Sequence, residues 1–193
     1  SIADALGLEK IVALQLEYSL VERAIEREHV PFALDAGLAV VPWGPLASGL
    51  LSGKHRRGHT AAHVESDGRL QKLAGSTHPG FAKLYSDRNW RIADVVTEVA
   101  RELGRSPAQI ALAWTMSRPA VSSTIVGATS REQLRDNLAA LDVTIPADAR
   151  RRFDDVSALE VVGPYAHFHA SMRGDVTGGT VVTSEPPTFR PRD

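Results

Sequence analysis

The chain contains two kinds of hydrophobic pattern, which predict two kinds of element. Three short apolar runs, at residues 11–16, 38–41 and 121–126, have the length and the β-branched content of buried strands. Residues 92–103 instead carry apolar side chains at 92, 95, 96, 99, 100 and 103, which is the period of a helical face. This order of strands and helices favours an α/β protein with a parallel sheet.

Residues that start or stop helices mark further helical segments. Ser106 followed by Pro107 is a strong start signal, and the apolar residues after it predict a buried helix with Trp114 in the core. Glycine ends helices readily because it adopts the left-handed conformation at little cost. The other predicted helices are 1–7 ending at Gly7, 21–29 before a break or restart at Pro31, a short one before Gly37, 131–140, and one after Pro146 through Phe153.

Composition narrows the class of protein. The 193 residues could form one domain with a sizeable core, and a net charge of -1 does not suggest nucleic acid or an anionic membrane as partner. The absence of cysteine excludes disulfides and thiolate metal sites, and it fits a cytoplasmic protein. No stretch has the apolar length of a membrane span, and the N-terminus does not resemble a signal peptide. Because the chain begins with Ser1 and not with methionine, we expect a fragment.

Two polar stretches interrupt these patterns. Residues 55–89 are long, polar and rich in glycine and proline, which predicts an irregular segment. Its histidines, His55, His59, His63 and His78, have spacings that fit no helical ligand pair, so we expect no metal site. The last residues, 174–193, are rich in Gly, Pro, Thr and Ser and predict a flexible tail.

Two polar features near the first strand require partners. Gln15 lies inside the apolar run 11–16, and a buried amide needs a hydrogen bond, either from neighbouring backbone or from a ligand. Arg23 and Glu26 lie one helical turn apart, which predicts a surface ion pair worth a few tenths of a kcal/mol.

The stretch from Ala39 to Lys54, AVVPWGPLASGLLSGK, has features of a ligand-binding loop. Pro42 removes a donor of the sheet ladder, so the strand must end close to it. Small residues then allow a ligand to approach the backbone, Lys54 supplies charge, and Trp43 offers a flat face to a planar ring. The alternative interpretation is a buried strand with an ordinary turn, and with Trp43 in the core.

A second candidate loop follows the third apolar run. Ser130 and Gln133 have the spacing of a capping box, which alone would account for both residues. The same helix start is also a possible anion site, because its N–H groups are positive and Arg131 lies in its first turn.

Four strings resemble the aldo-keto reductase family. QLEYSL (15–20) is similar to the family's QxEYSL, and WGPLASGLLSGK (43–54) is similar to WSPLAxGLLTGK. RSPAQIALAW (105–114) resembles GxSPAQVALAW, and IVGATSREQLRDNL (125–138) resembles IxGARxxEQLxEN. The resemblance runs from about residue 3 to 165. One departure is Thr129, which stands where the family usually has arginine, and Arg131 is a candidate substitute.

The resemblance implies an oxidoreductase that uses NADP(H) to reduce a small-molecule carbonyl to an alcohol by hydride transfer. It implies that Gln15 bonds the nicotinamide carboxamide. It also implies an arginine over the pyrophosphate, for which Arg69 in DGRL is the best match and Arg56 and Arg57 are competitors. The cofactor-binding residues that it implies are Gln15, Trp43, Gly44, Pro45, Leu46, Ala47, Gly49, Lys54, Arg69, Gly127, Ala128, Thr129, Ser130, Arg131, Gln133 and Asn137.

The implied fold is a (β/α)8 barrel, which typically needs about 250 residues. We therefore expect an incomplete barrel, with residues 1–165 as its C-terminal part and 166–193 as an irregular tail. No segment matches the family's catalytic Tyr, Lys, Asp and His, and Tyr18, Tyr85 and Tyr165 lie outside that motif. We name no catalytic residue and expect activity only with the missing N-terminal barrel part. The alternatives are a non-catalytic NADP-binding regulatory subunit and an unrelated phosphate-binding barrel fragment.

Overall fold

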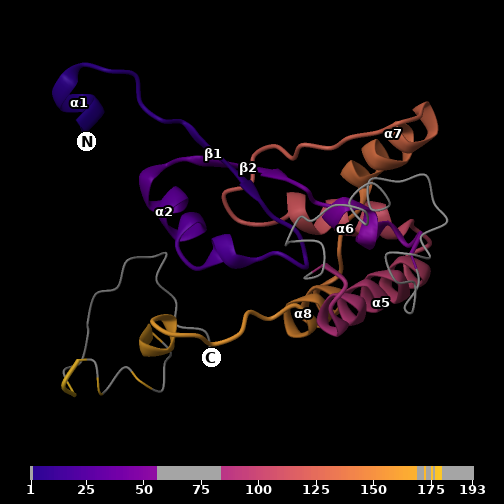
Figure 1. The fold of residues 1–193 in the computed structure, drawn as a ribbon. Helices are drawn as coiled ribbons and strands as arrows, with labels where there is room; N and C mark the ends of the chain where they lie inside the picture. Colours follow the sequence, from indigo (N-terminus) through magenta and orange to yellow (C-terminus); the bar gives the residue numbers. More distant parts are fainter. Residues whose placement is uncertain (1, 56–83, 169–171, 173–174, 176, 180–193) are drawn as a thin grey trace.

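A short parallel sheet lies between helices in the computed structural model, which describes residues 2–55, 84–168, 172, 175 and 177–179. Strands β1 (Ala13–Glu17) and β2 (Ala39–Trp43) pair in parallel, and α2 (His29–Ala36) connects them. Figure 1 shows α5 (Asp87–Glu102), α6 (Pro107–Met116) and α8 (Ala147–Val156) together beyond the end of the sheet, with α7 (Arg131–Leu138) above them. The other elements are α1 (Ile2–Leu6) and the 3-10 turns η1 (Ala24–Glu26), η2 (Ala47–Ser52), η4 (Ala139–Asp142) and η5 (Tyr165–Phe168).

The two faces of the sheet differ in how well they are covered. Successive residues of a strand point to opposite faces. Leu14, Leu16 and Val40 pack into the hydrophobic core together with the helices, and Val40 has no exposed surface. The alternate positions Ala13, Gln15 and Glu17 are exposed. The chain therefore covers one face of this parallel sheet and leaves the other open.

The predicted third strand at 121–126 is not a continuous strand. One isolated parallel bridge joins Val40 to Val121, where the Val40 N–H donates to Ala120 at 2.7 Å and the Ser122 N–H donates to Val40 at 3.1 Å. The next ladder bond would need an N–H from Pro42, which proline does not have. Instead the Ile125 N–H donates to the Pro42 carbonyl at 2.8 Å, one residue out of step. The segment therefore follows β2 in parallel without completing a ladder.

Several predicted helix ends are confirmed. Ser106 caps α6 in a full capping box with Gln109, Pro107 is the first helical residue, and Trp114 is fully buried. Gly37 ends α2 with a φ of 66°, in the left-handed region that favours glycine. The helix predicted at 92–103 is also present, within α5.

Two predicted boundaries are wrong. Residues 21–29 are not one helix, because they contain only η1 before α2 begins at His29. Ser19 and Glu22 bond each other's backbone in a turn just before η1. The predicted restart at Pro31 is confirmed, since Pro31 lies in the first turn of the new helix α2, where its missing N–H costs nothing. The irregular stretch predicted to reach residue 89 ends earlier, because Ser86 caps α5 through the backbone N–H of Asn89.

Candidate functional site

Gln15 and Trp43 lie on the same open face of the sheet. In the parallel register Gln15 pairs with Val41 and Glu17 pairs with Trp43, so these residues alternate with the covered ones and share a face. Trp43 is 43% exposed, which contradicts the alternative of a core tryptophan. No hydrogen bond joins the Gln15 amide to another residue of the described ranges. Both side chains are thus available to a ligand on this face.

The two predicted loops leave the sheet at the same edge. Because Ile125 bonds Pro42, the chain enters residues 126–131 beside the point where Trp43 begins the loop 44–54. Strand β1 ends at that edge too, since the Tyr18 N–H donates to the Trp43 carbonyl at 3.2 Å. In open parallel sheets ligands bind outside the carboxyl ends of the strands, which is this edge.

The loop 44–54 has an unusual backbone. Ala47 and Ser48 have φ values of 49° and 56°, in the left-handed region that residues with a side chain rarely adopt. Such residues cost roughly 1–3 kcal/mol each and are concentrated at functional sites. Backbone bonds close the turn, with the Ala47 N–H donating to Gly44 at 2.8 Å and the Gly49 N–H donating to Leu46 at 2.9 Å. The conformation of this loop is therefore stabilised by hydrogen bonds between its own backbone groups.

The predicted residues of this loop differ in access. Pro45 and Ala47 are buried, Gly44, Leu46 and Gly49 are half-buried, and Lys54 is exposed. A Cβ added to Gly44 would lie 3.7 Å from Oε1 of Glu17, which is an ordinary van der Waals contact. Buried side chains shape the loop, while the backbone of its glycines and Lys54 are the parts that a ligand could reach.

The turn before α7 is held by Gln133. Its Oε1 accepts hydrogen bonds from the Thr129 N–H and from the Thr129 hydroxyl, both at 2.9 Å. Ser130 caps the helix by accepting from the Gln133 N–H at 3.2 Å. The predicted capping box is therefore wrong in one half, because the Gln133 side chain reaches Thr129 instead of returning to Ser130. The reason is that Oε1 finds two donors on Thr129.

The remaining predicted residues of this turn have different surroundings. Asn137 is buried, and its Nδ2 donates to the Gly127 carbonyl at 3.4 Å. Gly127, Ala128 and Arg131 are exposed. Glu132 lies beside Arg131, and its own backbone N–H and the Ser130 hydroxyl lower the pKa of its carboxyl. Arg131 is therefore the cation that this helix start offers to an anion, next to an ionised carboxylate.

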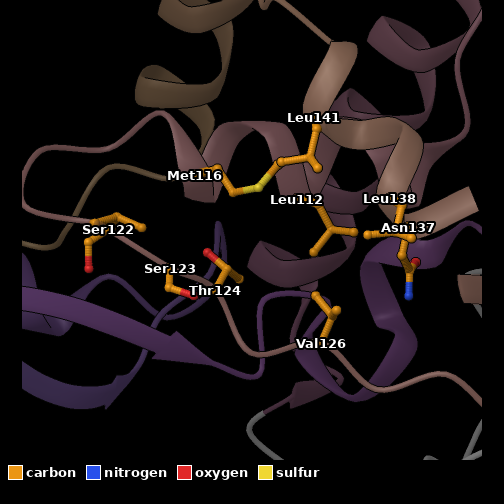
Figure 2. Close-up of a pocket in the computed structure, with 10 residues that line it drawn as sticks. Leu112, Met116, Ser122, Ser123, Thr124, Val126, Asn137, Leu138 and Leu141 are labelled. Atoms are coloured by element: carbon orange, nitrogen blue, oxygen red, sulfur yellow. The ribbon is translucent and has the colours of Figure 1, made fainter.

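A cavity of about 350 Å³ lies behind this turn, between α6, α7 and the segment 121–126. Figure 2 shows Met116 and Leu112 of α6 facing Leu141 and Leu138 across it, with Thr124 and Val126 on the other side. Its lining is mainly apolar, and Asn137 is the predicted cofactor residue among the residues that line it. This cavity is distinct from the open face that carries Gln15 and Trp43.

A buried polar network lies on the covered side of the sheet, and it was not predicted from the sequence. The Arg23 and Glu26 side chains are only 3% and 5% exposed, so the prediction of a surface ion pair is wrong. Nε and Nη2 of Arg23 donate to the two Glu26 oxygens at 2.8 and 2.9 Å, and the Tyr18 hydroxyl donates to Oε1 of Glu26 at 2.6 Å. Nη1 of Arg23 donates to the Ser157 hydroxyl at 2.6 Å.

Arg118 extends this network to α6 and α8. It donates to the Tyr18 hydroxyl at 3.2 Å and pairs with Asp154 at 3.4 Å. The guanidinium groups of Arg118 and Arg23 lie 4.9 and 5.3 Å from the centroid of the Trp114 ring. The spacing from Arg23 to Glu26 was the available sequence signal, but its distant partners could not be read from the sequence.

The network shifts two pKa values in opposite directions. Burial would raise the pKa of Glu26, but the hydrogen bonds and charge of Arg23, with help from Tyr18 and Arg118, lower it to about 2. Burial, reinforced by the Glu26 charge, raises the pKa of Tyr18 above its usual value. Tyr18 therefore stays protonated, and its hydroxyl is committed to the Glu26 carboxylate.

Some predictions fall on other parts of the chain. Arg69, together with His59, His63, His78 and most of the tail after residue 168, lies outside the described residues. Among residues that the structure describes, no group of three His, Cys, Asp or Glu side chains could hold a metal ion. In the same ranges no helix is both long and apolar enough to cross a membrane.

Together these features define an α/β chain with two shaped loops and an accessible indole at one edge of a parallel sheet. The sequence model described as "Aldo/keto reductase family" matches residues 2–158. The chain therefore belongs to the aldo/keto reductase family, whose fold is a (β/α)8 barrel. The described residues form a two-stranded parallel sheet.

Curated relatives carry oxidoreductase and channel-subunit names. The chain is 34% identical over 146 residues to "Uncharacterized oxidoreductase YrpG" of Bacillus subtilis (strain 168), covering 76% of this chain and 40% of that protein. It is 36% identical over 160 residues to "Probable voltage-gated potassium channel subunit beta" of Oryza sativa subsp. japonica, covering 82% and 47%. It is 32% identical over 164 residues to "Probable aldo-keto reductase 1" of Glycine max, covering 84% and 45%. The chain thus spans less than half the length of these relatives.

Proposed function

We propose that this chain is the cofactor-binding part of an NADP-dependent aldo-keto reductase that reduces a small-molecule carbonyl to an alcohol. The observation that carries the proposal is the open face of the sheet, where an exposed indole and a free amide lie at the edge from which both loops leave. This arrangement fits NADP(H). Its nicotinamide ring needs an aromatic face, and its pyrophosphate and its 2′-phosphate each need a polar loop.

The residues divide between the parts of NADP(H). Trp43 would stack on the nicotinamide ring, and the Gln15 amide would bond its carboxamide. The loop with Gly44, Pro45, Leu46, Ala47, Gly49 and Lys54, together with Arg69, would hold the pyrophosphate. Gly127, Ala128, Thr129, Ser130, Gln133 and Asn137 would hold the adenosine end, with Arg131 at the 2′-phosphate. When bound, the cofactor supplies the hydride.

The rest of the proposal concerns what completes the site. The relatives are more than twice as long as the region that matches them, which supports an incomplete barrel. We take residues 1–165 to be its C-terminal part and residues 166–193 to be a tail. We infer that an N-terminal barrel part supplies the catalytic Tyr, Lys, Asp and His, and that the protein is cytoplasmic. Purified alone, the 193-residue chain should not consume NADPH with an aldehyde. Steady consumption would contradict this part of the proposal.

A second candidate function is a non-catalytic NADP-binding regulatory subunit. The observation that favours it is the similarity to proteins named voltage-gated potassium channel subunit beta, at 36% identity for those of Oryza sativa subsp. japonica and Arabidopsis thaliana. The two functions differ in whether the whole protein carries the catalytic Tyr, Lys, Asp and His. A coding segment upstream of Ser1 that encodes the missing Tyr, Lys, Asp and His favours the reductase, and one that lacks them favours the regulatory subunit.

Cofactor binding is tested by calorimetric titration of the full chain with NADPH and NADH. We expect NADPH to bind, and to bind more weakly to Gln15→Leu and Trp43→Ala. Phe32→Ala is the matched control, because Phe32 is an exposed aromatic residue on α2, outside the proposed site. Arg131→Gln should weaken NADPH more than NADH, since only NADPH carries the 2′-phosphate. Failure of the unchanged chain to bind either cofactor would overturn the proposal.

A further inference from the structure

The first turn of α6 contacts the loop 44–54 on one side and helix α7 on the other. Gly53, at the end of the loop 44–54, lies so close to Pro107 that an added Cβ would be 2.8 Å from its Cγ. On its other side the same turn bonds α7 through Asp136. The turn therefore lies between the proposed pyrophosphate loop and the helix that begins with the proposed adenosine turn.

The contact with α7 is a closed set of hydrogen bonds. The Ser106 hydroxyl donates to Oδ2 of Asp136 at 2.8 Å, and Nε2 of Gln109 donates to Oδ1 at 2.7 Å. The same two α6 residues complete the capping box, since Ser106 Oγ accepts from the Gln109 N–H and Oε1 of Gln109 accepts from the Ser106 N–H. The carboxylate also lies at the positive end of α6, where a negative charge is favourable.

Helix α7 carries this contact to the adenosine turn. Asp136 is followed by Asn137, which bonds the Gly127 carbonyl, and Gln133 of the same helix holds Thr129. A shift of α7 against α6 would thus move the whole turn 127–131. The other loop would stay where Gly53 meets Pro107.

We propose that Asp136 is a positioning residue that, through Ser106 and Gln109, fixes the spacing between the loop 44–54 and the turn 127–131. The inference rests on the proposed function, because the spacing matters to a ligand that spans both loops. A ligand held at two points loses affinity when their separation is wrong, even if each point is unchanged. Each half of the dinucleotide needs one loop and is insensitive to the spacing.

The first experiment compares the intact cofactor with its halves on the full chain. Asp136→Asn removes one acceptor from α6 at constant size, and Asp142→Asn, an exposed acid in η4, is the matched control. For Asp136→Asn we expect NADPH to bind roughly 10- to 100-fold more weakly, with the affinities of 2′,5′-ADP and nicotinamide mononucleotide unchanged. An equal loss for NADPH and 2′,5′-ADP would overturn the spacing role, because it would mean a local effect on the adenosine end.

The second experiment measures the spacing without a cofactor. The chain has no cysteine, so Lys54→Cys with Glu132→Cys introduces two unique sites for spin labels, both at exposed positions. We expect a narrow distance distribution between the labels, and a broader or shifted one when Asp136→Asn is added. Gln109→Met, which removes the amide on the α6 side, should act in the same way and serves if Asp136→Asn does not fold.

The two experiments separate the inference from the proposed function. An unchanged distance distribution in both Asp136→Asn and Gln109→Met would overturn the inference, whatever binds to the chain. Absence of NADPH binding to the unchanged chain would overturn the proposed function, and the label distances would then decide the positioning role by themselves.

Discussion

The two sides of the sheet differ in how far the chain satisfies its own side chains. On the covered side, Arg23 is 3% exposed and bonds Glu26 and Ser157, from elements far apart in the sequence. On the open side, Trp43 is 43% exposed and Gln15 has no hydrogen-bond partner among the residues described. On the covered side, every donor nitrogen of Arg23 finds an acceptor within this chain. The open side has the composition of a surface that a ligand or further strands would cover.

The largest expected effect is a difference in the free energy of unfolding between a variant of the covered side and a variant of the open side. Arg23→Ala would leave the Glu26 carboxylate buried without its main partner, and breaking such a pair typically costs about 3–5 kcal/mol. Trp43→Ala removes a half-exposed side chain and should cost about 1 kcal/mol or less. Urea unfolding followed by circular dichroism measures both. Similar losses for the two variants would mean that the sides do not differ in this way.

The second largest expected effect is a loss of folding stability at acidic pH, which arises from Glu26 on the covered side. The pKa of Glu26 is lowered to about 2 from an ordinary value of 4.5, so the folded state favours the ionised carboxyl. The resulting stability, roughly 3 kcal/mol, is fully present above pH 4.5 and is lost as the pH falls toward 2. Glu26→Gln should therefore be less stable at neutral pH and should lose less stability across this window. Parallel stability curves for the two proteins, measured between pH 5 and 2, would contradict the assignment.

The smallest effect concerns the contact between the loop 44–54 and α6. Gly53 and Gly37 both have left-handed φ values, 78° and 66°, but only Gly53 faces Pro107, and nothing lies within 4 Å of a Cβ at Gly37. Gly37→Ala should cost about 1 kcal/mol through the backbone alone. Gly53→Ala should cost roughly 1–3 kcal/mol more, since it adds a clash in a packed region. Thermal unfolding of the two variants gives the difference, and equal costs would show that the loop moves away from Pro107 freely.

Local signals in the sequence predicted the helices of the covered side well. Ser106 with Pro107 starts α6, Gly37 ends α2, and the apolar period at 92–103 marks the buried face of α5. These features succeed because each depends on backbone chemistry within a few residues. The burial of Trp114 follows from the same kind of pattern, since its helix is apolar on most sides.

Features that depend on distant residues were predicted less well. The spacing of Arg23 and Glu26 gives an ion pair, but its burial depends on Ser157, which follows 134 residues after Arg23. The run 121–126 has strand composition, yet Pro42 of its neighbour lacks the N–H that a ladder requires. In the candidate site, Gln133 fits a capping box by spacing, while Thr129 offers it two donors that spacing cannot reveal.

The position of Ser157 also limits how the chain can be shortened. Its hydroxyl accepts from Arg23, and its backbone carbonyl accepts from Arg88 at 2.9 Å, so it serves two arginines from separate parts of the chain. A truncated version that ends before this residue would leave the Arg23 guanidinium in the interior with one acceptor fewer. Any expression version intended to preserve the fold should therefore extend past the end of α8.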